Sequence, residues 1–461
     1  MPILGAAVLP HPPVILPEVG RGSEHNLKKT TEAYIEAARW LAGLRPETVI
    51  ITTPHSTVYG DYFHISPGPT AEGDMRAFRA PELRVTADYD EEFVALLSDI
   101  AGEREVPAGT LGERNRALDH GTLIPLYFLN KFYSGYRIVR IGLSGQSPIC
   151  HYRLGQSIAE TADKLGRQAV VIASGDLSHK LLEDGPYGYV AEGSEFDKQI
   201  TDLLRAGDFL SLLEVTEGFA DAAAECGLRS FQIMAGALDR KAVSHKLLSY
   251  EGPFGVGYAV ALFEVGGEDE TRAFGEKYED SERARLSACR EREDQYVCLA
   301  RLSLETYIET GKPAVLPENI SEEMTSTKAG VFVSLKKHGK LRGCIGTISA
   351  LTENVAEEVM KNAVSAAVND PRFDPVTAGE LGDLEYSVDV LGETEAVSSV
   401  DKLDEKRYGV IVRSGNRTGL LLPGLEGVNS VEKQIEIARK KARIRENEPV
   451  ELHRFEVVRH Y

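Results

Sequence analysis

Residues 48–55 read TVIITTPH, a β-branched apolar run that ends in a proline and a histidine. The same pattern occurs twice more: residues 3–11 read ILGAAVLPH, and residues 169–179 read AVVIASGDLSH. Continuous apolar runs of this kind favour strands buried on both faces, as in a parallel sheet. Ligands of open α/β sheets bind beyond the carboxyl ends of the strands. We therefore expect the three terminal histidines to converge in one crevice around a metal ion.

The composition narrows the class of partner. The chain has 461 residues, enough for two to four domains, and its 42% apolar and 27% charged residues are typical of a globular protein. The formal net charge of −19 argues against a nucleic-acid partner, because phosphate neutralisation needs clustered lysine and arginine. The apolar runs are far shorter than the roughly 18 residues that a membrane helix needs. We expect neither a nucleic-acid nor a membrane partner.

The five cysteines are odd in number and show no CxxC spacing. This usage predicts a reduced, cytoplasmic location and argues against a structural zinc finger. The N-terminus lacks the basic segment of a secretory signal, so none is expected. The sequence does not fix the oligomeric state, and a homodimer is left open.

The spacing of apolar residues predicts the class of the first domain. Residues 24–44 show helical spacing between the first two strands, which predicts a βαβ unit with parallel strands. Residues 59–73, rich in glycine and proline, are expected to form loops on the rim of the site. Residues 245–250 and 257–265 read as closing strands. We predict an α/β domain over residues 1–265, with a mostly parallel sheet flanked by helices.

A second domain is expected after a linker. The linker covers residues 266–284 and begins with the acidic, glycine-rich GGEDE. Residues 285–461 mix predicted helices and strands without a regular βα alternation, which favours an α+β class.

Two neutral imidazoles and one carboxylate form the facial triad that suits non-haem Fe(II). His11 and His55 are the two candidate imidazoles, because each sits in a stiff proline turn at a strand end. Glu225 is the favoured carboxylate, since its small neighbours would let it approach a metal closely. Cys226, a softer ligand, and Glu251 are the alternatives.

Two further histidines are candidates for catalysis. His179 is the predicted acid/base, because an unperturbed imidazole titrates near neutrality. Asp176, in the same turn, would orient a ring or begin a helix. His120 lies in the stretch LDHG (residues 118–121) and is predicted to bind substrate or to support the ligands.

The sharpest motif of the second domain is LRGCIGT at residues 341–347. Cys344 lies between two glycines, so backbone amides can reach its sulfur, and Arg342 is close in sequence. Both would favour a thiolate, which makes Cys344 a candidate catalytic residue. The alternative is a tight glycine turn with a buried, inert thiol. Asp370 and Arg372 are expected to pair with each other.

Four motifs in order resemble the class III extradiol dioxygenase superfamily of the protocatechuate 4,5-dioxygenase catalytic-subunit type, and the related Memo family. The resemblance covers residues 1–265 and rests on PHPP, TPHS, LDHG and SGDLSH, which begin at residues 10, 53, 118 and 174. It implies an iron(II)-dependent oxidoreductase, a dioxygenase that opens the ring of a small, catechol-like substrate.

The same resemblance assigns roles to residues. It implies Fe(II) bound by His11, His55 and Glu225, with His179 as the acid/base and His120 lining the substrate site. Memo-like proteins would instead place a cysteine, here Cys226, as the third ligand, which leaves that ligand open.

Residues 285–461 resemble the AMMECR family, through the stretch at 341–347 and NDPRFDP at 369–375. That resemblance implies a domain and no particular chemistry. AMMECR and Memo-like proteins look like associates of a radical-SAM enzyme. Three functions are therefore weighed: a ring-cleaving dioxygenase, a Memo-like metal protein that works with a radical-SAM partner in a modification pathway, and a binding scaffold without catalysis.

Overall fold

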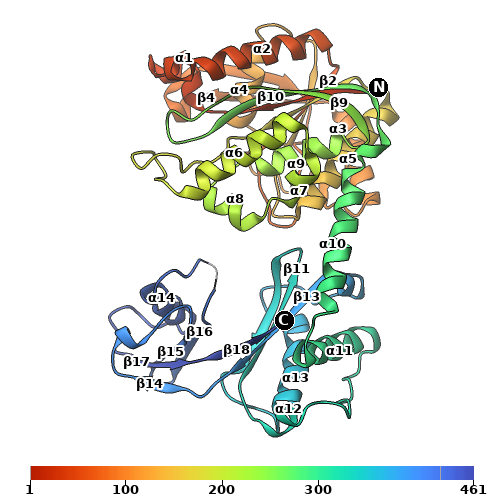
Figure 1. Cartoon of the computed structure of the whole chain (residues 1–461). Coiled ribbons are helices and arrows are strands. Elements are labelled where there is room, and N and C mark those ends of the chain that lie inside the picture. Colours follow the sequence, from red (N-terminus) through yellow and green to blue (C-terminus); the bar gives the residue numbers. More distant parts are fainter. Residues whose placement is uncertain (1, 426) are drawn as a thin grey trace. The chain divides into compact units, whose positions relative to one another are not determined.

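The computed structural model describes residues 2–425 and 427–461. The chain forms two compact units, Met1–Ser281 and Glu282–Tyr461 (Figure 1). None of the described helices is long and apolar enough to cross a membrane.

The first unit is built on a six-stranded sheet in the order β7-β2-β8-β1-β10-β9. The four strands β7, β2, β8 and β1 are parallel, and β10 and β9 add an antiparallel edge. This confirms the predicted α/β class with a mostly parallel sheet. The strands are β1 (Ile3–Leu9), β2 (Thr48–Thr53), β7 (Arg137–Gly142), β8 (Ala169–Ser174), β9 (Lys241–Glu251) and β10 (Tyr258–Glu268).

Helices cover both faces of this sheet, which is why its strands read as continuous apolar runs (Figure 1). Ile50 and Ile51 of β2 are both fully buried, and they enter the two separate cores on opposite faces. One face carries α2 (Lys28–Leu44) and α4 (His120–Leu129), with α1 (Pro17–Gly20) nearby; the other carries α3 (Glu91–Glu103), α5 (Pro148–Leu165), α6 (Ala191–Ala206), α7 (Phe209–Glu214), α8 (Glu217–Ala223) and α9 (Leu228–Ala237).

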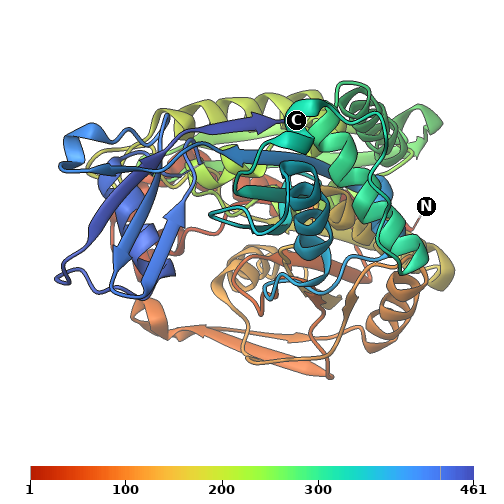
Figure 2. The same ribbon diagram turned by 90° about the horizontal axis from the view of Figure 1, so that it is seen from below.

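The segment expected as rim loops is more ordered than predicted. Part of it forms β4 (Thr70–Met75), which pairs with β5 (Ala80–Asp88) in the long ribbon coloured orange in Figure 2. Leu83 and Val85 of β5 are buried in the core, so alternating burial stabilises the hairpin despite its glycines and prolines. Two short strands, β3 (Phe63–His64) and β6 (Ala108–Gly109), pair with each other in a separate sheet.

The second unit contains two four-stranded sheets whose strand pairs are all antiparallel, which agrees with the predicted α+β class. One sheet has the order β12-β11-β13-β18 and the other β14-β17-β15-β16. The elements are α11 (Gln295–Thr310), α12 (Glu322–Ser326), β11 (Val331–Lys337), β12 (Lys340–Gly346), α13 (Val355–Val368), β13 (Leu384–Leu391), β14 (Glu395–Val397), β15 (Gly409–Ser414), β16 (Arg417–Leu421), α14 (Val431–Lys441), β17 (Glu451–Phe455) and β18 (Val457–His460).

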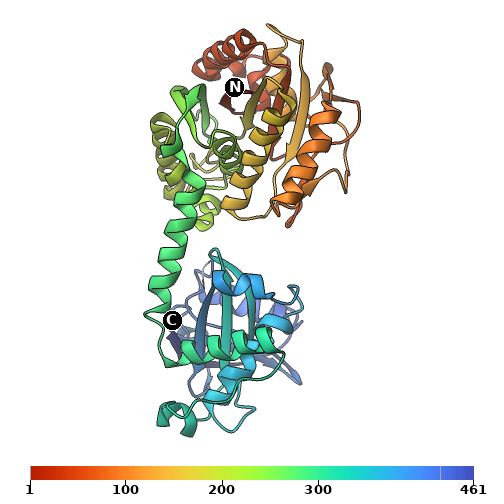
Figure 3. The same ribbon diagram turned by 90° about the vertical axis from the view of Figure 1, so that its right-hand side faces the viewer.

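The segment predicted as a linker is largely regular structure. Gly267 and Glu268 still pair with β9 across the hairpin. A short 3-10 turn follows, and then α10 (Phe274–Arg290), the unbroken helix drawn in green in Figure 3. The division between the units falls inside this helix, between Ser281 and Glu282. Pairing with β9 therefore orders glycines that the sequence alone makes look flexible.

The glycine motif of the second unit is also regular structure. Residues 341–346 lie on the edge strand β12 and not in a tight turn. A Cβ at Gly343 would lie 2.1 Å from the carbonyl oxygen of Ala366 on α13, and one at Gly346 would lie 2.2 Å from the ring of Phe332. The glycines are required for close packing of the strand against its neighbours.

Candidate metal centre

Two of the predicted histidines meet at the carboxyl ends of β1 and β2, the two strands that flank β8. His11 follows β1 and is 1% exposed, whereas His55 follows β2 and is exposed. Their Nε2 atoms lie 2.9 Å apart, and the rings meet edge to face. Imidazoles separated by 44 residues of sequence thus converge, as the strand-end argument predicts.

The hydrogen bonds around His11 fix its tautomer. The hydroxyl of Ser174 has a single proton, which it donates to the carbonyl oxygen of Gly121 at 2.6 Å. The same oxygen lies 2.9 Å from Nδ1 of His11, so it accepts the Nδ1 proton and leaves a lone pair on Nε2. Burial, followed by the charge of His55, lowers the pKa of His11 to about 3. His11 is therefore a neutral imidazole whose free nitrogen faces His55, as a metal ligand requires.

Cys226 completes a set of three donor atoms. Its Sγ lies 3.7 Å from Nε2 of His11, and the donor atoms of His11, His55 and Cys226 all lie within 4.8 Å of one another. Two glycines make this approach possible: a Cβ at Gly175 would lie 2.2 Å from Cα of Gly227. Any side chain there would push the segment after β8 away from Cys226.

Glu225, the carboxylate favoured as the third ligand, lies outside this donor set. Its carboxylate accepts the backbone N–H of Leu228 at 2.6 Å, at the start of α9, and it lines a separate cavity of about 80 Å³. Burial raises its pKa to about 7. Glu251 is also elsewhere, since it accepts both the backbone N–H and the hydroxyl of Thr30 at 2.7 Å. Adjacent residues leave the backbone in different directions, and here the thiol of Cys226 turns toward the histidines.

A second donor set shares the same thiol. The donor atoms of Asp176, His179 and Cys226 also lie within 4.8 Å of one another. Asp176 accepts the backbone N–H of His11 at 2.8 Å, and its other oxygen lies 3.9 Å from Nε2 of that residue. Burial raises the pKa of Asp176 to about 6. From the sequence, Asp176 was expected to orient a ring or to begin a helix, whereas its place in the SGDLSH turn brings it into this second donor set.

His179 is the imidazole of this second set. Its Nε2 is buried and has no hydrogen-bond partner among the described residues. Burial lowers its pKa, so the ring is neutral near pH 7. The ring of Tyr187 packs 5.2 Å from that of His179. A neutral imidazole with an unpaired buried nitrogen can accept or return a proton.

His120 stacks directly on the first set. Its ring centroid lies 4.1 Å from that of His55 and 5.1 Å from that of Phe78. Burial, followed by the charges of His55 and His11, lowers the pKa of His120 to about 3. Asp119 caps α4 by accepting the N–H of Thr122. This cap fixes His120 at the first turn of the helix.

These residues fit a transition-metal ion. Two nitrogens bound at right angles, each about 2.1 Å from one ion, would lie about 3 Å apart, close to the 2.9 Å between His11 and His55. Burial, followed by the charge of Asp176, raises the pKa of the Cys226 thiol well above its usual range. A bound cation would reverse that preference and favour the thiolate.

The environment of Cys344 in the second unit is of another kind. Its backbone N–H donates to Asp370 at 2.9 Å, and Ser334 donates its hydroxyl proton to the sulfur at 3.2 Å. Asp370 and Arg372 form the expected ion pair at 2.6 Å. Arg342 instead donates to Glu380 and does not contribute its charge to the thiol through any hydrogen bond or ion pair among the described residues.

Comparisons with known proteins agree with the division of the chain into two units. Residues 5–261 match the family described as the catalytic LigB subunit of aromatic ring-opening dioxygenase, and residues 297–460 match the AMMECR1 family. A Clostridium acetobutylicum protein is 42% identical over the whole of this chain and 99% of its own length. A Thermotoga maritima protein is 46% identical over 36% of this chain and 98% of its own length.

Two crystal structures of uncharacterized proteins are also similar. One, from Pyrococcus horikoshii, is 31% identical over 37% of this chain and 90% of its own, with a TM-score of 0.34. The other, from Escherichia coli K12, is 14% identical over 57% of this chain and 99% of its own, with a TM-score of 0.37.

The fold and the donor set define the class: a two-unit protein whose first unit has an α/β sheet with a cluster of metal-ligand side chains at its carboxyl edge. The chain belongs to the LigB family of ring-opening dioxygenase catalytic subunits through this unit, fused to an AMMECR1-family domain.

Proposed function

We propose that the first unit is a metal-dependent oxidoreductase centre, with Fe(II) held by His11, His55 and Cys226. The observation that supports it most directly is the 4.8 Å limit within which their three donor atoms lie. An iron ion bound there would act as a Lewis acid and as the redox partner of a coordinated substrate. Membership of the LigB family favours iron, and the thiol also makes the set compatible with copper.

The side chains around the donors have separate tasks in this proposal. Ser174 holds His11 in the tautomer that keeps Nε2 free. His179 accepts a proton from the substrate at its unpaired Nε2 and later returns it. His120 hydrogen-bonds an oxygen of the substrate, and its stacking on His55 keeps it beside the donors.

The substrate of the proposed centre is a small molecule with a flat ring, such as a catechol. His55 is exposed, so the donor set can be reached from solvent. The rings of Phe78 and Tyr187 lie against His120 and His179, where they would flank a planar substrate.

A second candidate is Memo-like chemistry without ring cleavage, carried out with a radical-SAM partner in a modification pathway. The specific observation that favours it is the place of Cys226 beside His11, where the ring-cleaving resemblance expects a carboxylate. A non-catalytic scaffold is the third candidate, and it has no need of stoichiometric metal.

Metal analysis after anaerobic purification tests the centre itself. We expect about one iron per chain in the native protein. Cys226→Ser should lower iron affinity by at least about tenfold, while Glu225→Gln, which keeps the hydrogen bond to Leu228, should retain iron. Full iron retention by a His11→Ala/His55→Ala double variant would contradict the proposal.

Oxygen uptake separates the first two candidates. Iron-loaded protein should consume oxygen with at least one member of a catechol panel if it cleaves rings, with the His179→Ala variant as the inactive control. Stoichiometric iron without oxygen uptake would favour the Memo-like alternative.

A further inference from the structure

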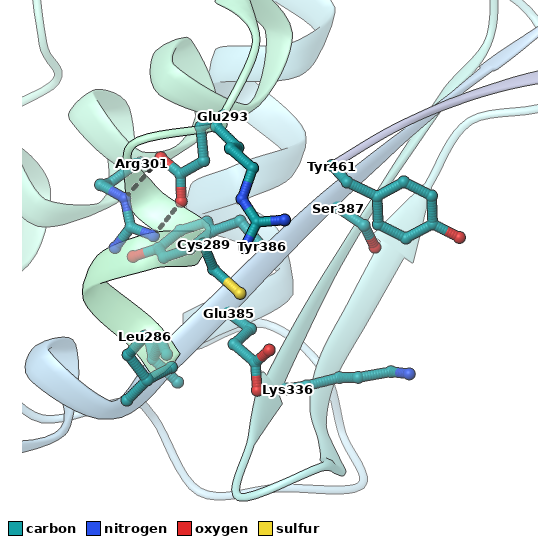
Figure 4. Close-up of a pocket in the computed structure, with 11 residues that line it drawn as sticks. Leu286, Cys289, Glu293, Arg301, Lys336, Glu385, Tyr386, Ser387 and Tyr461 are labelled. Carbon is teal, nitrogen blue, oxygen red and sulfur yellow. Dashed lines mark hydrogen bonds and ion pairs between the residues drawn. The ribbon is translucent and has the colours of Figure 1, made fainter. Parts of the chain in front are cut away.

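The second unit contains a cavity of about 350 Å³ that lies away from Cys344 (Figure 4). It is bounded by the end of α10, the start of α11 and the strands β11 and β13. All of its lining residues belong to the second unit. This volume is within the range of small-molecule sites, which begins at about 300 Å³.

Each of the two acidic side chains on the wall forms an ion pair with an arginine. Glu293 pairs with Arg301 in a nearly buried ion pair, and the close-up shows this pair as one side of the cavity (Figure 4). Glu385 accepts two hydrogen bonds from Arg285, at 2.8 and 2.9 Å. These two acidic groups are therefore not available to hold a cationic ligand.

Two further cations lie on the same wall. Arg292 and Lys336 line the cavity, and neither forms an ion pair with any carboxylate among the described residues. The Nε of Arg292 donates to the carbonyl oxygen of Ala288, which anchors the start of its guanidinium. The lining residues thus include three cationic side chains, Arg292, Arg301 and Lys336, and two acidic ones, although the chain as a whole carries −19.

The rest of the lining is apolar and partly aromatic. Leu286 and Leu384 are buried, and the guanidinium of Arg301 lies 4.3 Å from the centre of the Tyr386 ring. Cys289 also lines the cavity (Figure 4). A ligand here would meet flat apolar surface on one side and cationic groups on the other.

We propose that this cavity binds a small organic anion with a flat apolar body, such as an aromatic carboxylate. The carboxylate lies toward Arg292 and Lys336, and the ring packs on Leu286 and Tyr386. The site is independent of the proposed metal centre, because none of its residues lies in the first unit.

The native Cys289 provides a direct readout of occupancy. The full chain is alkylated with iodoacetamide in the presence of benzoate or of benzamide, its uncharged analogue, and the modification of each cysteine is followed by mass spectrometry. Benzoate should slow the alkylation of Cys289 in a saturable manner, with little effect from benzamide. Cys298 is exposed, lies in the same unit and does not line the cavity, so its rate should be unchanged.

Charge-reversal variants test the source of the selectivity. Arg292→Glu and Lys336→Glu, both at exposed positions, should each weaken protection by benzoate at least about tenfold, as expected for loss of a charge-assisted contact. Lys312→Glu makes the same charge change at an exposed position outside the lining. In this variant, benzoate should protect Cys289 as well as it does in the wild type. Equal protection by benzoate and benzamide, no protection by either, or normal protection in both reversal variants would overturn the proposal.

Discussion

The donor cluster of the first unit and the surroundings of Cys344 in the second unit contain similar residue types but differ in how their charges and lone pairs are satisfied. In the first unit, the lone pair of His11 faces His55 and Cys226, and His179 has an unpaired buried nitrogen. In the second, Asp370 is paired with Arg372 and accepts the amide of Cys344.

This difference separates two uses of polar side chains. Metal-ligand side chains that converge on one point form a site that an external positive ion can occupy in place of their protons. Polar groups that satisfy one another stabilise local structure and need no ligand. On this comparison the first unit carries the better candidate for chemistry, and Cys344 stays a prediction from its sequence motif.

Of these substitutions, Gly175→Ala should have the largest effect, on the metal content of the donor cluster in the first unit. The new Cβ would lie 2.2 Å from Cα of Gly227 and force the Asp176 turn away from Cys226. We expect the variant to lose stoichiometric metal, measured by elemental analysis of anaerobically purified protein. Gly102→Ala is the control, because nothing lies within 4 Å of its Cβ at the end of α3. Normal metal content in the Gly175 variant would show that close contact between these turns is not needed.

Asp197→Asn should change how the stability of the first unit depends on pH. Asp197 is 1% exposed, and burial raises its pKa to about 7 from an ordinary 3.8. The folded state therefore holds the proton more tightly than the unfolded state, so stability falls as pH rises from about 4 to about 7. A difference of about three units corresponds to an upper limit of about 4 kcal/mol. Asparagine removes this titration and can keep the contacts with Ser178 and Tyr250.

The measurement is urea unfolding across pH 5–8, followed by tryptophan fluorescence. Trp40 is the one tryptophan of the chain and lies in α2, so its signal reports the first unit. The stability of the second unit should depend on pH in the opposite direction, and over a lower pH range. Burial alone would raise the pKa of Glu380, but its hydrogen bonds, chiefly with Arg342, lower it to about 2, so that contribution is lost as pH falls from about 4.5. An unchanged pH slope in Asp197→Asn would contradict the assignment.

Asp370→Ala tests the structural role of the charges beside Cys344. The substitution leaves the amide of Cys344 and the guanidinium of Arg372 without their acceptor. We expect a loss of about 2 kcal/mol in the stability of the second unit, measured by circular dichroism during denaturation. Cys344→Ala should cost less than about 1 kcal/mol, because the thiol accepts only a weak hydrogen bond from Ser334. A larger loss for the cysteine than for the aspartate would reverse this ranking.

Ser174→Ala should have the smallest effect, a reduced affinity for metal. It removes the acceptor that fixes the tautomer of His11 while leaving all three donor atoms in place. Loss of such a supporting hydrogen bond lowers metal affinity by about tenfold or more. Competition with a chelator of known affinity measures the change, and Ser98→Ala, on α3 with its hydroxyl bonded to Val94, is a matched control. Equal affinity in wild type and Ser174→Ala would remove Ser174 from the site.

The parts of the fold that depend on local patterning could be predicted from the sequence. The strand-end histidines were recognisable because continuous apolar runs and prolines mark where each strand stops. The hairpin of β4 and β5 was missed, since its stability comes from burial of Leu83 and Val85 against distant elements. The glycines at 343 and 346 suggested a turn, but contacts with α13 and Phe332 account for them.

The third donor could not be chosen from the sequence, for a geometric reason. Glu225 and Cys226 are adjacent, and their different directions depend on the turn at Ala224, which has a φ of 54°, and on the close approach of Gly175 and Gly227. The turn at Ala224 is local, but the approach of Gly175 to Gly227 joins segments about fifty residues apart, which no local pattern records. The cavity beside Cys289 was missed for the same reason, because helices and strands from separate parts of the chain enclose it.

The position of β8 between β1 and β2 has a consequence for biosynthesis. Gly5 pairs with Val170, and Thr48 pairs with Ala169 and Arg137, so the first two strands have no partner until much later segments leave the ribosome. Such long-range pairing is slow and leaves apolar strands uncovered in the growing chain. His11 and His55 are translated early, yet they can be brought together only after β8 has joined them. At the proposed metal centre, an ion would therefore be captured late in maturation, after the sheet has formed.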